Sequence, residues 1–393
     1  MVGFGAGIFL ELQRIMIRLS SCLFLGFIIL VASYLFATPC SYVLRGAQSF
    51  FQFKTYIDVI DLNTNQCVAS YKVPPGISQI VMNKNGNFFF LFKESPNDIK
   101  PVHEIQEYAL KGKKLSIAFR NKSMDPVDVF FAKNHYFFLF DLILKSPEDI
   151  QKYPNLVPYQ YAGFEVYANK KNLSLLGYLR LGEFDHVEGC DLNADQSKLY
   201  IVADPYNIVL KTGGGIYNKE SISFLYIVDT QTREIIKKKE LTPFFKGVQG
   251  LKVVGEKVYM GALYKKSYTG KKELVNQDLN KNLFVFDIKT LSLIKKFHLE
   301  AMVRKIEYSP DDKRLFVMHQ GQLGSCKAAL TVVDTIHDKP VSLFEIPNLE
   351  EIRYVGCHKL FLVTHHKLLI LNTKTLKIEK EFSGTYWSIA KKL

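Results

Sequence analysis

The sequence predicts an all-β fold, a seven-bladed β-propeller with four-stranded blades. A unit of about 40 residues recurs along the chain, which is the size of one propeller blade. Within the unit, short apolar strands alternate with polar turns. The composition agrees, because 30 Phe and 21 Tyr among 393 residues suit the half-buried faces of strands. One such blade cannot bury both of its faces, whereas a closed ring of blades can.

The chain begins with a hydrophobic segment, CLFLGFIILVASYLFA at 22–37, which carries no charge and follows Arg18. A basic start, an apolar stretch and small residues near its end are typical of an export signal. We therefore predict a leader over 1–40 with an N-terminal hydrophobic helix, and a propeller over 41–393. Three alternatives stay open: a signal cleaved after Ala37, an uncleaved membrane anchor, or a lipoprotein attached at Cys40. Either Met1 or Met16 can be the start.

The repeats are clearest at 57–93, 224–263, 282–320 and 329–366, and weaker at 104–145 and 163–204. The last copy begins at Lys367 and stops one strand short. The segment SFFQFKTY at 49–56 precedes the first full copy and is available to complete the last one. We therefore expect the last blade to be closed by strands from both termini.

Three of these repeats resemble the YVTN family of propeller repeats: VIDLNTNQCVASYKV at 59–73, IVDTQTREIIKKKEL at 227–241 and EYSPDDKRLFVMH at 307–319. The family's "SPDG-like" turn has counterparts in Asn85-Gly86, Asp195-Gln196 and Asp311-Asp312, while its YVTN tetrapeptide is absent. Related propellers include amine dehydrogenase large subunits, cytochrome d1-type domains and lactonases. The resemblance implies the fold far better than it implies an activity.

Polar side chains recur at the second position of each innermost strand, between apolar neighbours, so we expect them to face the central channel. Aligned across the repeats, these residues are Ser78, Asp128, Glu188, Gln249, Arg304, Glu350 and Trp387. Such a ring can bind a polar ligand or a cation. The alternative is that it lines a hydrated channel with no ligand.

Three further residues end aromatic strands in different repeats: His319, His365 and Asp204. Imidazole and carboxylate are metal ligands, so these residues form a second candidate site, for a divalent metal in the central channel. Convergence is not implied, because neighbouring strand ends around a ring are commonly some 10 Å or more apart. No other cofactor is predicted.

The function that these features favour is an exported or membrane-tethered binding or scaffolding module. Long connections at 146–162, 205–222 and 264–281 all fall on one face of the ring, which we call the long-loop face. We expect a protein, glycan or small ligand there, and a membrane at the N-terminal segment. The alternative is an enzyme: a lactonase-like hydrolase using Glu188, Arg304, His319 and Glu350, or the non-cofactor subunit of an amine dehydrogenase-like oxidoreductase.

Charge and cysteine usage narrow the remaining classes. The net charge is +13, but the lysines are spread along the chain and form no nucleic-acid-binding motif, so we expect no nucleic-acid partner. No G-x-S-x-G nucleophile motif is present. The expected location is outside the cytoplasm, in the periplasm or at the cell surface. Cys326 and Cys357 lie in neighbouring repeats, and whether they form a disulfide is left open.

Overall fold

The computed structural model describes residues 39–49, 52–73, 77–82, 88–92, 103–111, 114–123, 126–140, 151, 161–168, 174–183, 185–205, 208–211, 214–217, 223–241, 246–264, 281–320 and 328–392. Apart from residues 39 and 40, the predicted leader over 1–40, with its hydrophobic helix, lies outside this part of the chain. Within the described residues, no helix is long and apolar enough to cross a membrane.

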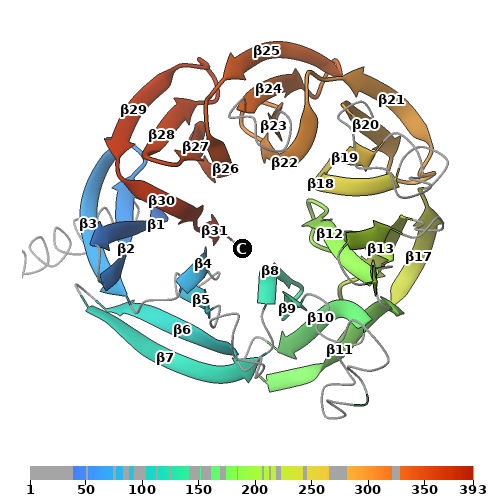
Figure 1. The fold of residues 1–393 in the computed structure, drawn as a ribbon, viewed down its shortest axis with the longest axis horizontal. Coiled ribbons are helices and arrows are strands. Elements are labelled where there is room, and N and C mark those ends of the chain that lie inside the picture. The colour runs from blue at the N-terminus through green and yellow to red at the C-terminus, as the bar shows by residue number, and fades with distance from the viewer. Residues whose placement is uncertain are drawn as a thin grey trace, which may run out of the picture.

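Antiparallel sheets surround a common axis, with their innermost strands toward the centre and their outermost strands along the circumference (Figure 1). The chain is therefore a β-propeller. Six of the sheets have four strands, and the remaining sheet of the ring has five. The expectation of seven four-stranded blades is thus corrected to six blades of that form. The five-stranded sheet differs because the two-residue β31 (Lys391–Lys392) is added parallel to the innermost strand of the first repeat.

The strands of each sheet follow one another outward from the axis. The first of the blades in the first half of the chain is the five-stranded sheet of β31, β4 (Ile77–Met82), β5 (Phe88–Phe92), β6 (His103–Lys111) and β7 (Lys114–Ser123). The next blade consists of β8 (Pro126–Ala132), β9 (His135–Phe140), β10 (Tyr161–Ala168) and β11 (Ser174–Glu183). The third consists of β12 (Asp185–Leu192), β13 (Lys198–Pro205), β16 (Phe224–Asp229) and β17 (Ile235–Glu240).

Three blades follow in the second half, each built from four consecutive strands. They are β18 (Lys246–Val254), β19 (Lys257–Tyr264), β20 (Asn282–Asp287) and β21 (Leu293–His298), then β22 (Met302–Ser309), β23 (Arg314–Gln320), β24 (Ala328–Asp334) and β25 (Lys339–Glu345), and then β26 (Leu349–Gly356), β27 (Lys359–Thr364), β28 (Lys367–Asn372) and β29 (Ile378–Ser383).

The remaining blade is closed by strands from the two ends of the described chain, as predicted. Its order outward is β30 (Thr385–Ile389), β1 (Cys40–Ser49), β2 (Gln52–Asp61) and β3 (Gln66–Val73). The segment that pairs with β30 is β1, however, and not 49–56. Val43 and Leu44 lie on opposite faces of β1 and are both fully buried. The strand therefore belongs to a blade that is covered on both faces.

The core lies between the blades. Each buried apolar cluster draws side chains from two neighbouring sheets, so every sheet contributes to two clusters. One cluster joins Val43 and Ile60 of the first blade to Phe361 and Ile370 of the preceding blade, across the closure of the ring. Because both faces of each sheet are apolar, both must be covered, and the ring satisfies this requirement.

We expect Leu44→Ala to lower the free energy of unfolding by about 2–5 kcal/mol, because it leaves a cavity in the cluster between the closing blade and the next one. Urea unfolding followed by fluorescence measures this loss. The matched control is Val68→Ala on β3 of the same blade, where 57% of the side chain is exposed and the expected change is about 0.5 kcal/mol or less. Equal losses in both variants would contradict the assignment of β1 to a buried position.

Candidate functional site

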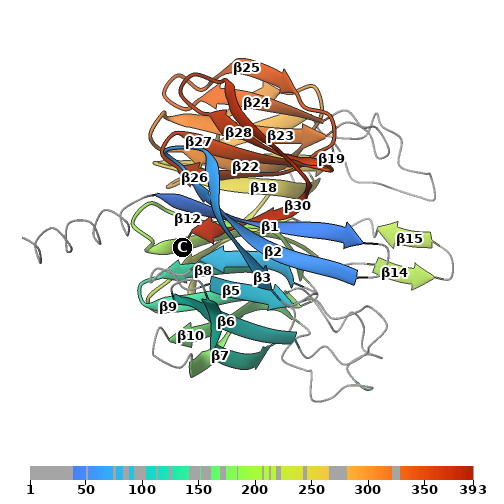
Figure 2. The same cartoon turned by 90° about the vertical axis from the view of Figure 1, so that its left-hand side faces the viewer.

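The innermost strands all run in the same direction, so the turns that follow them gather on one face of the ring. We call it the turn face; its described turns between innermost and second strands are 193–197, 255–256, 310–313 and 357–358. The opposite face is the long-loop face. β1 begins on the turn face, at the left in Figure 2, because the backbone N–H of Ala390 just after β30 donates to the carbonyl of Tyr42.

A cavity of about 420 Å³ opens at the axis on the turn face. Its lining includes aromatic and aliphatic side chains together with four charged ones, one from each of four consecutive innermost strands: Asp191 of β12, Lys252 of β18, Glu307 of β22 and Arg353 of β26. The sign of the charge alternates from strand to strand. Phe130, Phe131, Tyr308 and Tyr354 supply aromatic walls.

The first pair joins β12 to β18. Lys252 Nζ lies 3.1 Å from Asp191 Oδ1, and the backbone N–H of Val253 donates to Asp191 Oδ2 at 2.8 Å. The carboxylate of Asp191 is therefore fixed by two donors from the neighbouring blade. Hydrogen bonds between oppositely charged groups of this kind hold both side chains in place.

The second pair joins β22 to β26. Arg353 Nη1 lies 3.2 Å from Glu307, and Arg353 Nη2 lies 3.4 Å from Glu351 on its own strand. Lys305 also forms an ion pair with Glu351. The Nε atom of Arg353 is buried and has no hydrogen-bond partner. One N–H group of the guanidinium is therefore unpaired within the cavity wall.

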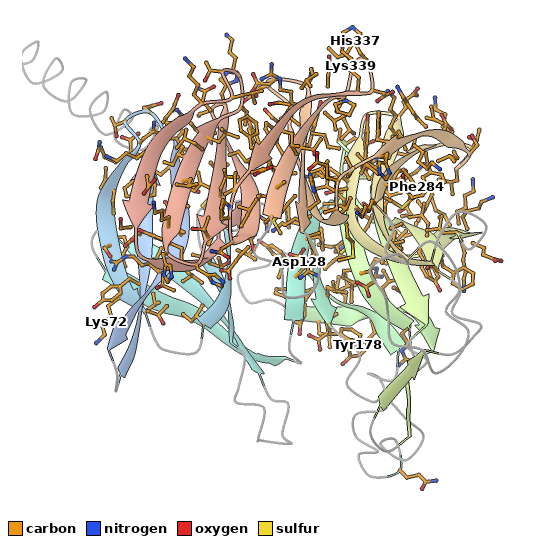
Figure 3. All side chains as sticks on the ribbon, turned by 45° about the horizontal axis from the view of Figure 1, so that its top comes forward. Lys72, Asp128, Tyr178, Phe284, His337 and Lys339 are labelled. Carbon is orange, nitrogen blue, oxygen red and sulfur yellow. The ribbon has the colours of Figure 1, made fainter. Side chains whose placement is uncertain are left out.

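The electrostatics keep both cations charged. Burial acts to lower the pKa of Lys252, but Asp191 and Glu307 outweigh it, and the net pKa is raised. For Arg353 burial again acts to lower the pKa, while Glu307, Glu351 and Asp128 raise it above the ordinary value. Asp128 lies at the inner edge of β8 (Figure 3), so its field reaches Arg353 from another part of the ring.

The predicted channel ring falls at β-bulges, where one strand carries an extra residue. Glu188, Arg304 and Glu350 are the residues skipped in the pairing of their innermost strands, as are Ser78 and Trp387. In β8 and β18 the shift adjoins Asp128 and Gln249. A bulge shifts the alternation of side chains by one residue. Counting every second residue past the bulge therefore assigns side chains to the wrong face of the strand.

The cavity charges lie three residues after the predicted ones, a consequence of the same bulges. Glu188, Gln249, Arg304 and Glu350 are followed at this spacing by Asp191, Lys252, Glu307 and Arg353. In the other blades the corresponding residues are the buried Val81, Phe131 and Ala390. The alternation of acid and base at a fixed offset in four consecutive repeats was the sequence signal that could have found the cavity.

The other predicted site residues are described only in part. Arg304 and Glu350 are exposed, and Glu350 lies 2.7 Å from His365 Nδ1. Asp128 and Glu188 are partly buried on innermost strands, while the side chains of Gln249, Trp387, Ser78 and Asp204 lie outside the described atoms. Whether these residues bind a ligand stays a prediction.

His319 of β23 is buried inside its own blade. Its Nε2 lies 2.7 Å from Thr331 Oγ1 of β24, and its Nδ1 has no partner. In the part of the chain that the structure describes, no hydrogen bond or ion pair joins it to Arg304 or Glu350, which with Glu188 are its expected partners in the hydrolase alternative. Among the described residues, no group of three His, Cys, Asp or Glu side chains could hold a metal ion.

The long-loop face carries an inserted hairpin. The chain between β13 and β16, expected as a loop over 205–222, contains β14 (Ile208–Lys211) paired with β15 (Gly214–Tyr217). This hairpin projects from the ring on the side opposite the start of β1 (Figure 2). Gly214 and Gly215 lie in β15. Cys326, the partner considered for Cys357, lies outside the described residues; Cys357 is a free thiol.

Comparison with known proteins gives the fold alone. No protein-family description matches the chain, and no curated protein matches it. Among solved structures, it is similar to a putative 6-phosphogluconolactonase from Bacteroides uniformis (10% identity, TM-score 0.57, 89% of this chain and 99% of that one) and to one from Bacteroides fragilis (13% identity, TM-score 0.54, 89% and 97%). Saccharomyces cerevisiae Sqt1 is similar at 9% identity and a TM-score of 0.52, over 88% of this chain and 86% of that one.

Removing one member of the second ion pair should cost more than removing both. We expect Arg353→Met to lower the free energy of unfolding by about 3–5 kcal/mol, because it leaves the 9%-exposed Glu307 carboxylate without its partner. The double variant R353M/E307Q should recover part of this loss. Urea unfolding of the three proteins gives the comparison. A double variant that is less stable than R353M would contradict the pairing.

The buried imidazole of His319 makes a pH-dependent contribution to stability. Burial lowers its pKa to about 4, so the folded protein keeps the ring neutral while the unfolded chain takes up a proton below about pH 6.5. The unfolded state then binds more protons, and stability falls as the pH drops from about 6.5 to about 4. His319→Gln should remove up to about 3 kcal/mol of this fall, measured by urea unfolding across the range. A wild-type and variant difference that is independent of pH would refute it.

Proposed function

We propose that the chain is an exported or membrane-tethered propeller that acts as a binding module, and that it takes a small uncharged polar ligand, such as the end of a glycan, in the axial cavity. The observation that carries this proposal is the lining of that cavity. Two cations and two carboxylates face it in alternating order, and all four are already paired or held by neighbouring blades.

The balance of charge favours an uncharged ligand. A ligand with a net charge would have to separate Lys252 from Asp191, or Arg353 from Glu307, and leave one buried group without a partner. Breaking such a pair is costly. A hydroxyl both donates and accepts, so a polyol can bind to the unused donors and lone pairs without separating the ions.

The apolar part of the wall suits the same ligand class. Ligand cavities combine mainly apolar walls with a few fixed polar groups, and here Phe130 and Phe131 lie beside the partly exposed Tyr308 and Tyr354. The carbon face of a sugar ring can pack on an aromatic ring while its hydroxyls reach the charged groups. The described lining of this cavity contains no Ser, Thr, Cys or His side chain, which supports binding over hydrolysis.

The two faces of the ring divide the remaining roles. A protein partner on the long-loop face is supported by the β14–β15 hairpin, which projects beyond the ring on that face (Figure 2). Export is supported by the apolar run at 22–37, which ends just before Pro39 and Cys40. The carbonyl of Pro39 accepts a hydrogen bond from Leu62, so the propeller begins immediately after that run.

The test is ligand binding with one ion pair of the cavity neutralised. A panel of neutral and of carboxylated glycans is screened against the full chain by saturation-transfer NMR, and the affinity of each binder is measured by calorimetry. We expect a neutral glycan to bind, and D191N/K252Q to weaken it by at least about tenfold, which is 1.4 kcal/mol.

The matched control is E256Q/K289Q, which neutralises an ion pair whose side chains are both about 70% exposed and do not line the cavity. This variant should bind as the wild type does. Binding of charged glycans alone, or an equal loss in both double variants, would rule out the axial cavity as a site for neutral ligands.

A further inference from the structure

Exposed aliphatic side chains lie on most outermost strands, including Val68 of β3, Leu176 of β11 and Ile378 of β29, and in one group of three neighbouring strands they combine with clustered lysines. β17 and β21 begin at the turn face with large apolar residues that stay open to solvent, β25 carries Val341 and Leu343 further along, and Ile336 stands in the turn before β25. The set is Ile235, Ile236, Leu293, Ile294, Ile336, Val341 and Leu343, with exposed fractions of 38–67%. Scattered apolar residues on a surface are ordinary, but a continuous group marks an interaction site.

Bulges aim the central members of this group outward. In the pairing of β16 with β17 the register skips Ile236, in β20 with β21 it skips Ile294, and in β24 with β25 it skips Val341. The skipped residue of a bulge leaves the regular sheet pattern. The same structural position presents an exposed aliphatic side chain in β3 and β11 as well, so it is the lysines that set the group of β17, β21 and β25 apart.

Lysines follow these aliphatic residues directly. β17 continues with Lys237, Lys238 and Lys239, and β21 continues with Lys295 and Lys296. None of the five forms an ion pair within the described part of the chain. Lys237 donates to the carbonyl of Lys289 at 3.1 Å, and Lys295 donates to the carbonyl of Asp338 at 2.6 Å. Each contact crosses to the turn of the next blade, so the three outer strands form one surface.

We call this surface, the seven aliphatic residues with the five lysines, the apolar–basic arc. Figure 1 shows β17, β21 and β25 in succession along the circumference, and Figure 3 shows His337 and Lys339 standing out at the rim beside the turn that holds Ile336. Lys238 lies 3.8 Å from the centre of the Phe224 ring, so its ammonium stays at the surface beside apolar groups. In strands β17, β21 and β25, lysines clearly outnumber the two carboxylates, Glu240 and Glu345.

We propose that the apolar–basic arc docks onto an anionic lipid surface. Apolar side chains that enter the headgroup region, flanked by lysines that attract anionic lipids, are the composition of an interfacial membrane contact. The position agrees with this occupant, because the outermost strands begin on the turn face, where β1 also begins directly after the apolar run at 22–37. A tether at that point and the arc would then both lie toward the turn face, although on different parts of the circumference (Figure 1).

The experiment places a tryptophan in the arc of the full chain reconstituted in vesicles of phosphatidylcholine and phosphatidylglycerol. In I294W, brominated acyl chains should quench the added emission several-fold more strongly than in V68W, which changes the equivalent bulge residue of β3, outside the arc. The single native Trp387 is common to both proteins and gives the background. Both sites are exposed, so the substitutions leave the core intact.

Charge provides the second measurement. Raising the salt concentration, or changing Lys295 and Lys296 to Gln, should reduce the quenching of I294W, because screening weakens attraction to anionic headgroups. Lys72→Gln on β3 is the matched control and should leave it unchanged. Equal quenching of I294W and V68W, or quenching of I294W that ignores both salt and the lysines, would overturn the proposal. Absence of quenching in I294W would assign the arc to a protein partner instead. Neither readout depends on a ligand in the axial cavity.

Discussion

Face-to-face packing of apolar sheets is the constraint on which the rest of this structure depends. Each sheet has two apolar faces, and each core cluster is shared between two neighbours, so no sheet is stable with one side uncovered. Closure follows from this requirement. Val43 and Leu44 of β1 show it most directly, because the two residues are adjacent in sequence yet each is buried in a different cluster.

The axial cavity is a product of the same packing. Innermost strands are held by their blades at fixed positions around the axis, so Asp191, Lys252, Glu307 and Arg353 meet although they are far apart in sequence. Their side chains do not need to be ordered by a ligand, since ion pairs between blades already hold them. A site built in this way is preorganised on rigid elements, which reduces the entropy lost on binding.

The repeat pattern predicted the class of fold, the strand content and the closure by both ends, because apolar periodicity records which faces are buried. It missed the identity of the closing strand and the position of the cavity. Both errors have local causes. Residues 41–48 lie between the predicted leader and the segment 49–56 and were assigned to no strand. The bulges at Glu188, Arg304 and Glu350 break the two-residue alternation on which the channel ring was counted. Contacts between blades, such as that of Arg353 with Glu307, cannot be predicted from the sequence of one repeat.

The pairing of β1 with β30 has a consequence for how the chain reaches its native state. Val43 pairs with Ile389, so the first strand of the ring waits for almost the last one. Contacts so distant in sequence form slowly, since the loop entropy is lost before the pairing stabilises anything. During synthesis or passage through a membrane, one edge of the nascent ring remains an open strand until its end arrives. An exported chain of this design would be exposed to strand-pairing aggregation throughout that interval, and would gain from any factor that shields β1 until β30 is delivered.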